Sequence, residues 1–302
     1  MTSGCAIDAS WERRWGIPEW EPRDMTICIA ATCEEGQTLI LCSDAEIGVE
    51  FTTAELGRAK WGGLCKGWNA AIAGTVANAQ EVILWAVKTA PSMPSNAMFD
   101  VRALLEKSYR KARLARAEGE FLASRGWTLQ ELIDHGKTKL PESTYANLDA
   151  RIALFDFGAD LIAAGFGDDD SAASILTVKN PGVCMDHTRL GFWCVGSGAT
   201  AAQMSLFGRN YSSEISLERA VYYVIEAKIS SERAAGVGER TDMYVKRKGT
   251  ETIGFSTDTV REMRAACSKI KPRDFGAKYQ EKLMQCGEFK QLEAATTKAK
   301  KS

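Results

Sequence analysis

Four residues near the start of the chain have types and spacings that could form a catalytic group. Thr26 stands at the head of an apolar run, Asp44 ends the next apolar run, Lys60 follows sixteen residues later, and Gly74 lies fourteen residues beyond Lys60. A threonine hydroxyl is a poor nucleophile at neutral pH and needs an adjacent base. At a free chain terminus that base can be the α-amine of the threonine itself, whose pKa is near ~8. The same residues are also compatible with an ordinary hairpin that carries surface charges.

The elements that must position Thr26 and Asp44 are two short strands. The apolar runs Ile27–Ala31 and Thr38–Cys42 flank the polar segment Glu34-Glu35-Gly36. Short β-branched strands around a turn that contains glycine are typical of a β-hairpin. A hairpin here would bring the acid back beside the threonine.

The stretch from Met25 to Gly74 resembles the start of a proteasome β-type subunit of the N-terminal-nucleophile (Ntn) hydrolase superfamily. It is closest to bacterial proteasome-like proteins that begin Met-Thr-x-Cys-Ile-Ala-Ala. In that family a nucleophilic Thr opens the first strand and an Asp closes the second. A Lys and then a Gly follow at the two intervals that are found here. Thr26 lies two residues further from Asp44 than the family spacing gives, which we attribute to a longer turn at Cys33–Gly36. An insertion of two residues keeps each side chain on its face of the strand.

The resemblance implies a role for each of the four residues. The freed amine of Thr26 would be the base and its hydroxyl the nucleophile, giving an acyl-enzyme ester that water hydrolyses. Lys60 would lower the pKa of that amine and stabilise negative charge on the hydroxyl oxygen, and Asp44 would keep Lys60 charged and oriented. The amide N–H of Gly74 would donate to the oxyanion, a contact worth about 3 kcal/mol of the barrier.

Two further catalytic positions follow from the resemblance. Ser197, in the Gly196-Ser197-Gly198 segment after an expected strand at Phe192–Val195, would place a hydroxyl beside the nucleophile. Glu232 matches a position where these subunits carry an Asp, but Ala235 stands where a Ser is expected three residues later. Glu232 is also compatible with being a plain acid on a helix surface.

The resemblance also implies a substrate and partners. The positions that line the substrate pocket in the family match Ile47, Gly48, Ile72 and Val76, so we expect an apolar side chain in the cleaved peptide. The substrate would be a peptide or protein, the assembly a homo-oligomer or ring, and the partner that feeds it an ATP-dependent unfoldase. No cofactor and no metal is expected.

Cys28 is an alternative nucleophile. It lies sixteen residues before Asp44, which is the interval that the family nucleophile has, and members of the superfamily do use an N-terminal Cys. This alternative would require cleavage after Ile27. A half-buried cysteine in a strand is the simpler interpretation.

The composition argues against several other kinds of site. The chain has 302 residues and a formal net charge of −1, which gives no reason to expect nucleic acid or a membrane surface as a partner. With two histidines and no Cys-x-x-Cys pair, a zinc site or a Ser-His-Asp triad is poorly supported. Nine scattered cysteines without a signal sequence favour a reducing, cytoplasmic location. No apolar run approaches the length of a membrane span.

The order of apolar patterns divides the chain into three parts. Residues 1–24 form an N-terminal extension or propeptide, 25–258 an Ntn hydrolase (proteasome-like) domain with a helical insertion at about 120–148, and 259–302 a helical, basic C-terminal tail. Pairs of helical patterns alternate with strand patterns along the domain. The expected fold class is α/β (α+β), a four-layer αββα sandwich of the Ntn hydrolase type with two antiparallel sheets between helical layers.

Three local expectations test the pattern reading. Ala77–Ala90 is predicted to be a helix whose buried side carries Val82, Ile83, Leu84, Trp85 and Val87. Lys137–Tyr145 is predicted to be a loop within the insertion, and Arg151–Phe157 a strand.

Two functions of different class remain open. The first is a threonine-type Ntn hydrolase, a peptidase or amidohydrolase that acts through Thr26 within a self-assembled oligomer and matures by autoprocessing. The second is a non-catalytic structural or assembly subunit of the same fold. The kept Asp44, Lys60 and Gly74 favour the first, whereas the departures at Glu232 and Ala235 favour the second.

The segment Met1–Asp24 bears on that choice. It is a propeptide removed to expose Thr26, an extension upstream of a true start at Met25, or a permanent segment whose tryptophans pack on a protein surface. The last of these would leave Thr26 without a free amine.

Overall fold

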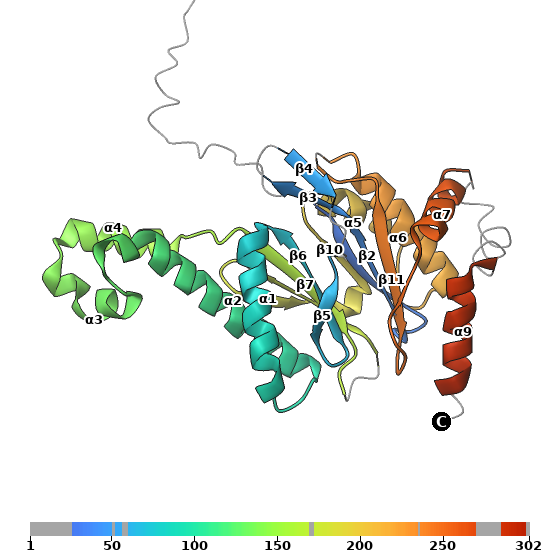
Figure 1. Cartoon of the computed structure of the whole chain (residues 1–302), viewed down its shortest axis with the longest axis horizontal. Helices are drawn as coiled ribbons and strands as arrows, with labels where there is room; N and C mark the ends of the chain where they lie inside the picture. Colours follow the sequence, from blue (N-terminus) through green and yellow to red (C-terminus); the bar gives the residue numbers. More distant parts are fainter. Residues whose placement is uncertain are drawn as a thin grey trace, which may run out of the picture.

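Two antiparallel five-stranded sheets face each other, and helices cover the outer face of each (Figure 1). The computed structural model describes residues 26–49, 52–55, 60–168, 172–234, 236–269 and 285–299. This arrangement confirms the expected four-layer αββα sandwich. The expected division of the chain into three parts, with boundaries after residues 24 and 258, stays a prediction. Residues 1–24 lie outside the described residues.

The first sheet has the strand order β10-β1-β2-β11-β12. Its strands are β1 (Cys28–Cys33), β2 (Thr38–Asp44), β10 (Phe192–Val195), β11 (Thr241–Arg247) and β12 (Ile253–Gly254). The predicted hairpin is confirmed, because β1 and β2 pair without a break from Cys28↔Ser43 to Cys33↔Thr38. This register brings the start of β1 and the end of β2 side by side at the same end of the strands.

The second sheet has the order β5-β6-β7-β8-β9, and β3 and β4 form a separate two-stranded sheet. The strands are β3 (Glu46–Val49), β4 (Thr52–Glu55), β5 (Gly62–Cys65), β6 (Trp68–Gly74), β7 (Ala159–Gly165), β8 (Ser174–Lys179) and β9 (Val183–Asp186). Alternate side chains of the two large sheets meet in a buried apolar layer, as the period of two in a strand requires. Cys28 and Ala30 of β1 lie in this layer, together with Ala71 and Ala73 of β6.

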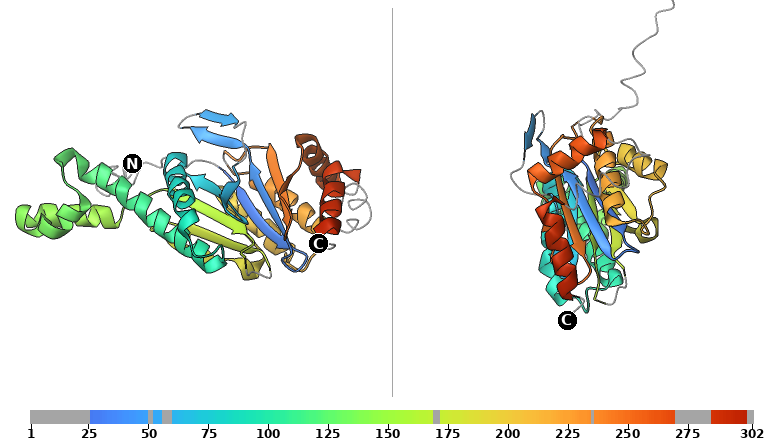
Figure 2. Two further views of the ribbon diagram at one scale, coloured as in Figure 1. Left: turned by 60° about the horizontal axis from the view of Figure 1, so that its bottom comes forward. Right: turned by 90° about the vertical axis from the view of Figure 1, so that its right-hand side faces the viewer.

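The helices form the two outer layers (Figure 2). Helices α1 (Val76–Thr89) and α2 (Met98–Phe121) cover the second sheet, and α5 (Ala199–Gly208) and α6 (Leu217–Ser231) cover the first. Helix α7 (Thr257–Lys269) packs against α6 and β11, and α9 (Gly287–Ala299) packs against β12. Short 3-10 turns occur at Ala90–Ser92, Ala123–Arg125 and Thr188–Leu190. Among the helices described, none is both long and apolar enough to cross a membrane.

Helix α1 differs from the prediction in its buried face. Ala79, Val82 and Ala86 face the sheet, whereas Leu84 is 70% and Val87 44% exposed. The prediction was wrong for these two residues because the apolar run is wider than the stripe that one sheet can cover.

The insertion is an arm that projects from the sandwich beyond the end of α2 (Figure 1, left). It contains α3 (Leu129–Lys139) and α4 (Glu142–Ala153), so both the loop predicted at Lys137–Tyr145 and the strand predicted at Arg151–Phe157 were wrong. A capping box between Thr128 and Glu131 starts α3. The two helices then bury side chains in a small core separate from the sheets, made of Ala117, Leu122, Leu132, Leu148 and Ile152.

Candidate active site

The hairpin ends bring a hydroxyl and a carboxylate into contact. Thr26, immediately before β1, donates its hydroxyl to Asp44 Oδ1 at 2.8 Å, and the Ile27 N–H donates to the same oxygen at 3.0 Å. The Thr26 residue is 3% exposed and Asp44 is fully buried. The predicted proximity of Thr26 and Asp44 is therefore present in the structure, and it depends on the unbroken β1–β2 register.

Lys60 completes a buried polar group with these two residues. Its Nζ lies 2.7 Å from Asp44 Oδ1 and also donates to the Thr26 hydroxyl oxygen. The Lys60 side chain is 5% exposed. The neighbouring Trp61 is anchored between the sheets and donates its indole N–H to the Cys42 carbonyl at 3.3 Å. A buried ammonium that faces a hydroxyl oxygen favours the negative charge that develops when this oxygen attacks.

The segment after β10 lies against the Thr26 backbone. The Thr26 N–H donates to Ser197 Oγ at 3.1 Å, and the Gly198 N–H donates to the Thr26 carbonyl at 3.3 Å. Gly196 has φ of +104°, and a Cβ there would lie 2.2 Å from the Thr26 carbonyl oxygen. A glycine at 196 is therefore required for this close approach, and it puts the Ser197 hydroxyl at the nitrogen that would become the α-amine.

Gly74 ends β6 on the opposite sheet. It has φ of +83°, and a Cβ there would lie 2.2 Å from the Gly158 carbonyl oxygen. The Cys28 thiol contacts the Ile72 carbonyl at 3.6 Å, which shows that the start of β1 and the end of β6 are neighbours across the sheets. Gly74, at the end of β6, thus lies at the same end of the sandwich as the Thr26 group.

Glu232 is not part of the Thr26 group. It follows the last residue of α6, and its carboxylate accepts hydrogen bonds from Lys228 at 2.6 Å and from Arg264 at 2.6 and 2.9 Å. The side chain turns toward α7, so its described contacts are with Lys228 and Arg264, and its expected catalytic role stays a prediction. Ala235 lies outside the described residues. Sequence reasoning missed Lys228, although its i,i+4 spacing to Glu232 is a signal for an ion pair.

The expected substrate-pocket residues are placed only in part. Ile72 is half-buried and packs at the margin of the core beneath α1, and Val76 is the half-buried first residue of α1. Ile47 and Gly48 lie in β3, and their side chains are outside the described part of the chain. The pocket therefore stays a prediction.

The environment of Cys28 does not favour it as the nucleophile. The residue is fully buried in β1, and burial raises the pKa of its thiol to about 12. The thiolate is the reactive form of cysteine, so a thiol in this setting is inert at neutral pH. The described residues contain no group of His, Cys, Asp and Glu side chains that could hold a metal ion.

The two facing sheets between helical layers define the class of fold as a proteasome-like sandwich. Solved structures of Anbu proteins share this fold. Anbu from Yersinia bercovieri, described as an ancestral beta-subunit, matches at 14% identity and a TM-score of 0.57, covering 81% of this chain and 94% of its own. A Gly-1 mutant of Anbu from Hyphomicrobium sp. strain MC1 matches at 15% identity and a TM-score of 0.55, over 81% and 93% of the two chains. The helical assembly of the Anbu complex from Pseudomonas aeruginosa matches at 17% identity and a TM-score of 0.57, with the same two coverages, 81% and 93%.

These comparisons correct the family that the sequence resemblance indicated. No family model matches the chain, and no curated protein matches it. The structural neighbours are Anbu proteins at 14 to 17% identity, a level that shows the fold and not family membership. The assignment to the proteasome β-type subunit family was therefore wrong, and what the chain shares with these proteins is the proteasome-like fold.

Proposed function

We propose that this protein is a threonine-type Ntn hydrolase that cleaves peptide bonds. The observation that carries the proposal is the convergence on Thr26 of groups from separate parts of the chain. Its hydroxyl contacts both Asp44 and Lys60, and its nitrogen faces Ser197. An ion pair that only stabilises the fold needs no hydroxyl beside it, whereas a hydroxyl nucleophile needs polar groups around it that activate it.

The proposed reaction begins with hydrolysis of the peptide bond between Met25 and Thr26, in which water gives its hydroxyl to the Met25 carbonyl carbon and a proton to the Thr26 nitrogen. The α-amine set free takes the proton from the Thr26 hydroxyl as Oγ1 attacks the substrate carbonyl carbon, and the carbonyl π electrons move onto oxygen. The Gly74 N–H donates to that oxyanion. Collapse of the intermediate breaks the C–N bond, and the amine leaves with the proton from the α-amine. Water then hydrolyses the ester and restores the Thr26 hydroxyl.

Lys60 and Asp44 act in this scheme through charge. The ammonium of Lys60 stabilises the alkoxide character of Oγ1, while Asp44 keeps that ammonium in place. Both are nearly excluded from water, so their electrostatic effect on Oγ1 is stronger than in solvent. The β-methyl of threonine restricts χ1 and holds Oγ1 toward the substrate.

The proposal includes an assembly, a substrate and a location. We propose a homo-oligomer, because the Anbu complex from Pseudomonas aeruginosa forms a helical assembly. An apolar side chain next to the cleaved bond would occupy a pocket lined by Ile47, Gly48, Ile72 and Val76. A closed assembly that degrades folded proteins would need an ATP-dependent unfoldase. We place the protein in the cytoplasm, where free thiols such as the eight described cysteines persist.

Two measurements test the proposed nucleophile. The mass and N-terminal sequence of the purified full chain should show a mature form that begins at Thr26. A peptide epoxyketone, which reacts with an N-terminal threonine through both hydroxyl and amine, should label that form. Thr26→Ala should abolish labelling and hydrolysis, while Thr26→Ser should keep part of both.

Thr32→Val is the matched control. Thr32 is a buried threonine within β1, and its hydroxyl donates to the Gly191 carbonyl and not to Asp44. Labelling that survives Thr26→Ala would exclude Thr26 as the nucleophile.

A non-catalytic assembly subunit is the second candidate. It is favoured by the burial of Thr26, which is 3% exposed in the chain that still contains Met25. A purified chain that keeps its first residues, resists the epoxyketone and still assembles, as judged by light scattering, would support this candidate.

A further inference from the structure

A second buried ammonium lies behind the Thr26 group. Lys228 on α6 is fully buried, and its Nζ donates to Glu232 Oε1 and to the Gly238 carbonyl, each at 2.6 Å. Lysine is almost never fully buried without a partner, because removing its charge from water is costly. Lys228 is therefore held in one place by a carboxylate and a backbone carbonyl.

Gly238 connects Lys228 to the candidate active site. Its N–H faces Asp44 Oδ2 at 3.5 Å, whereas Asp44 Oδ1 takes the contacts of Thr26 and Lys60. The same segment also holds the backbone next to Asp44, since the Ala45 N–H donates to the Arg240 carbonyl at 3.3 Å. Lys228 thus fixes the backbone at Gly238, which borders Asp44 Oδ2.

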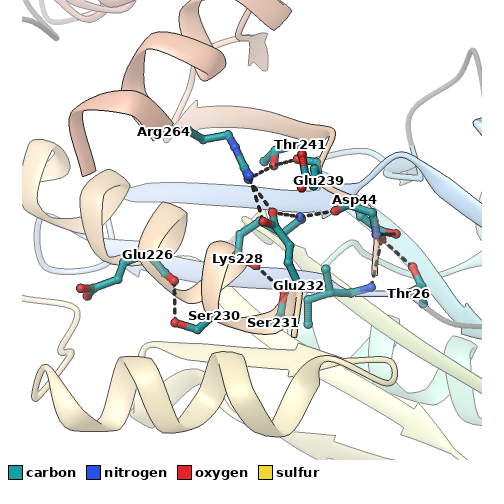
Figure 3. A network of polar contacts seen from close by, with 12 residues as sticks. Thr26, Asp44, Glu226, Lys228, Ser230, Ser231, Glu232, Glu239, Thr241 and Arg264 are labelled. Carbon is teal, nitrogen blue, oxygen red and sulfur yellow. Dashed lines mark hydrogen bonds and ion pairs between the residues drawn. The ribbon is translucent and has the colours of Figure 1, made fainter. Parts of the chain in front are cut away.

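Arg264 ties α7 to this network (Figure 3). Its guanidinium donates to both oxygens of Glu232, at 2.6 and 2.9 Å, and to the Thr241 hydroxyl at 3.0 Å. The hydrogen bonds to Glu232 raise the pKa of the Arg264 guanidinium above its usual value. A two-point contact of this kind fixes orientation as well as distance.

The end of α6 also supports the segment that carries Ser197. A Cβ at Gly198 would lie 2.8 Å from the Ser231 Cβ, and the Ser231 hydroxyl donates to the Lys228 carbonyl at 2.6 Å. One turn of helix therefore lies behind two segments that touch the Thr26 group.

We infer that Lys228 is a positioning residue for the Thr26 site. It holds Gly238 against Asp44, and Glu232 and Arg264 keep Lys228 in place, so that α7 takes part in fixing the geometry of a reaction it does not touch. The inference rests on the proposed function for its effect on rate, but its structural step, the fixing of the Gly238 segment, can be measured separately.

Lys228→Met in the full-length chain is the principal test. Methionine has a similar length, and the substitution leaves Glu232 paired with Arg264, so no carboxylate is left without a cation. The maximal rate of epoxyketone labelling should fall by roughly tenfold to a hundredfold, the size expected from a small misplacement of reacting groups. The epoxyketone concentration that gives half that rate should not change. Backbone amides in the peptide 236–244 should exchange hydrogen faster.

Arg261→Gln is the control, and Arg264→Gln is a second variant. Arg261 lies on the same helix and pairs with Asp258, but these side chains are 72% and 84% exposed and do not contact Glu232 in the described network. The control should behave as the wild type. Arg264→Gln should show the same changes as Lys228→Met at smaller size, and it carries the test if Lys228→Met does not fold.

The outcomes separate the two proposals. Wild-type labelling and exchange in Lys228→Met, or in Arg264→Gln if only that variant folds, would overturn the positioning role while leaving the hydrolase in place. If the wild type itself is not labelled, the proposed function fails. In that case faster exchange at 236–244 still supports the positioning of the segment, and unchanged exchange overturns it.

Discussion

Two buried lysines of this protein look alike until their remaining contacts are compared. The side chains of Lys60 and Lys228 are 5% and 0% exposed, and their ammonium groups lie 2.7 and 2.6 Å from a carboxylate. Lys60 also donates to the Thr26 hydroxyl, whereas Lys228 donates to the Gly238 carbonyl. A backbone carbonyl cannot act as a nucleophile, but a hydroxyl can. Burial and pairing with a carboxylate are therefore common to both lysines, and the third partner of each ammonium is what distinguishes them.

The two carboxylates differ as well. Asp44 shares its charge with one cation and accepts the Thr26 hydroxyl, while Glu232 is shared between Lys228 and Arg264. Removal of the Glu232 carboxylate would leave the fully buried Lys228 ammonium without this partner. The Lys228 centre should thus be the more important for stability, and the Lys60 centre for activity.

The largest expected effect is that of Lys60→Met on activity. Loss of the ammonium beside Oγ1 should lower kcat/KM for a peptide substrate by roughly 10³-fold or more. The control is Lys66→Met, because the Lys66 side chain is 79% exposed and pairs with Asp168. Activity within tenfold of wild type in Lys60→Met would contradict the proposed role and remove the contrast between the lysines.

Glu232→Gln should have the largest effect on stability. Because Lys228 then keeps a buried charge without its carboxylate, the free energy of unfolding should fall by about 3 to 5 kcal/mol. Lys228→Met leaves the Glu232–Arg264 pair and should cost less. Urea denaturation at pH 7 measures the free energy of unfolding of both variants. Equal losses would show that Glu232 does not stabilise the protein by neutralising the buried Lys228 charge.

His187 makes its own contribution to the pH dependence of stability, which must be known before the stabilities of the two lysine centres are compared at different pH values. Burial lowers its pKa from 6.5 to about 4, and its ring bonds to Thr177 at 2.8 Å and stacks on Trp193. The unfolded chain binds the proton more tightly, so this group adds stability above pH 6.5 that is lost as pH falls toward 4. The loss should total about 3 kcal/mol.

Urea denaturation at several pH values checks the His187 effect. His187→Gln should flatten the decline between pH 6.5 and 4, whereas His135→Gln, at an exposed position of α3, should keep it. A decline that is the same in both variants would assign the pH dependence to another group.

The smallest effect is expected at the exposed ion pair of α7. Arg261→Gln should change the free energy of unfolding by less than about 0.5 kcal/mol, since exposed pairs contribute little. A larger change in thermal or urea denaturation would mean that the Arg261–Asp258 pair stabilises α7 more than its exposure predicts.

The hairpin could be predicted because it depends on local pattern, whereas the expectation for Lys60 and Gly74 came from the resemblance. Two apolar runs around a short turn pair as β1 and β2, and their register brings Thr26 to Asp44. The contact of Glu232 with Arg264 could not be predicted in this way. It joins residues on different helices, and nothing local in either segment specifies which partner the carboxylate meets.

The two errors in the insertion have a different cause. Arg151–Phe157 is a short apolar run like that of a strand, but Leu148 and Ile152 are four residues apart and share the buried face of α4. Short apolar runs are compatible with either period, and the packing partner decides between them. The packing partner of Arg151–Phe157 is the core of the arm. Most residues of that core come from other segments of the chain, so the run itself does not reveal them.

The arm also bears on how the protein can be handled and how chains of this fold can vary. Its side chains pack among themselves, and Arg113 clamps its root by donating to the carbonyls of Ile152, Ala153 and Phe155. Such a module can be lengthened, shortened or exchanged while the two sheets keep their register. The number of residues between Gly74 and Ser197 can therefore differ between related molecules. A dye or affinity tag at the tip of the arm would leave the end of the sandwich that carries Thr26 undisturbed.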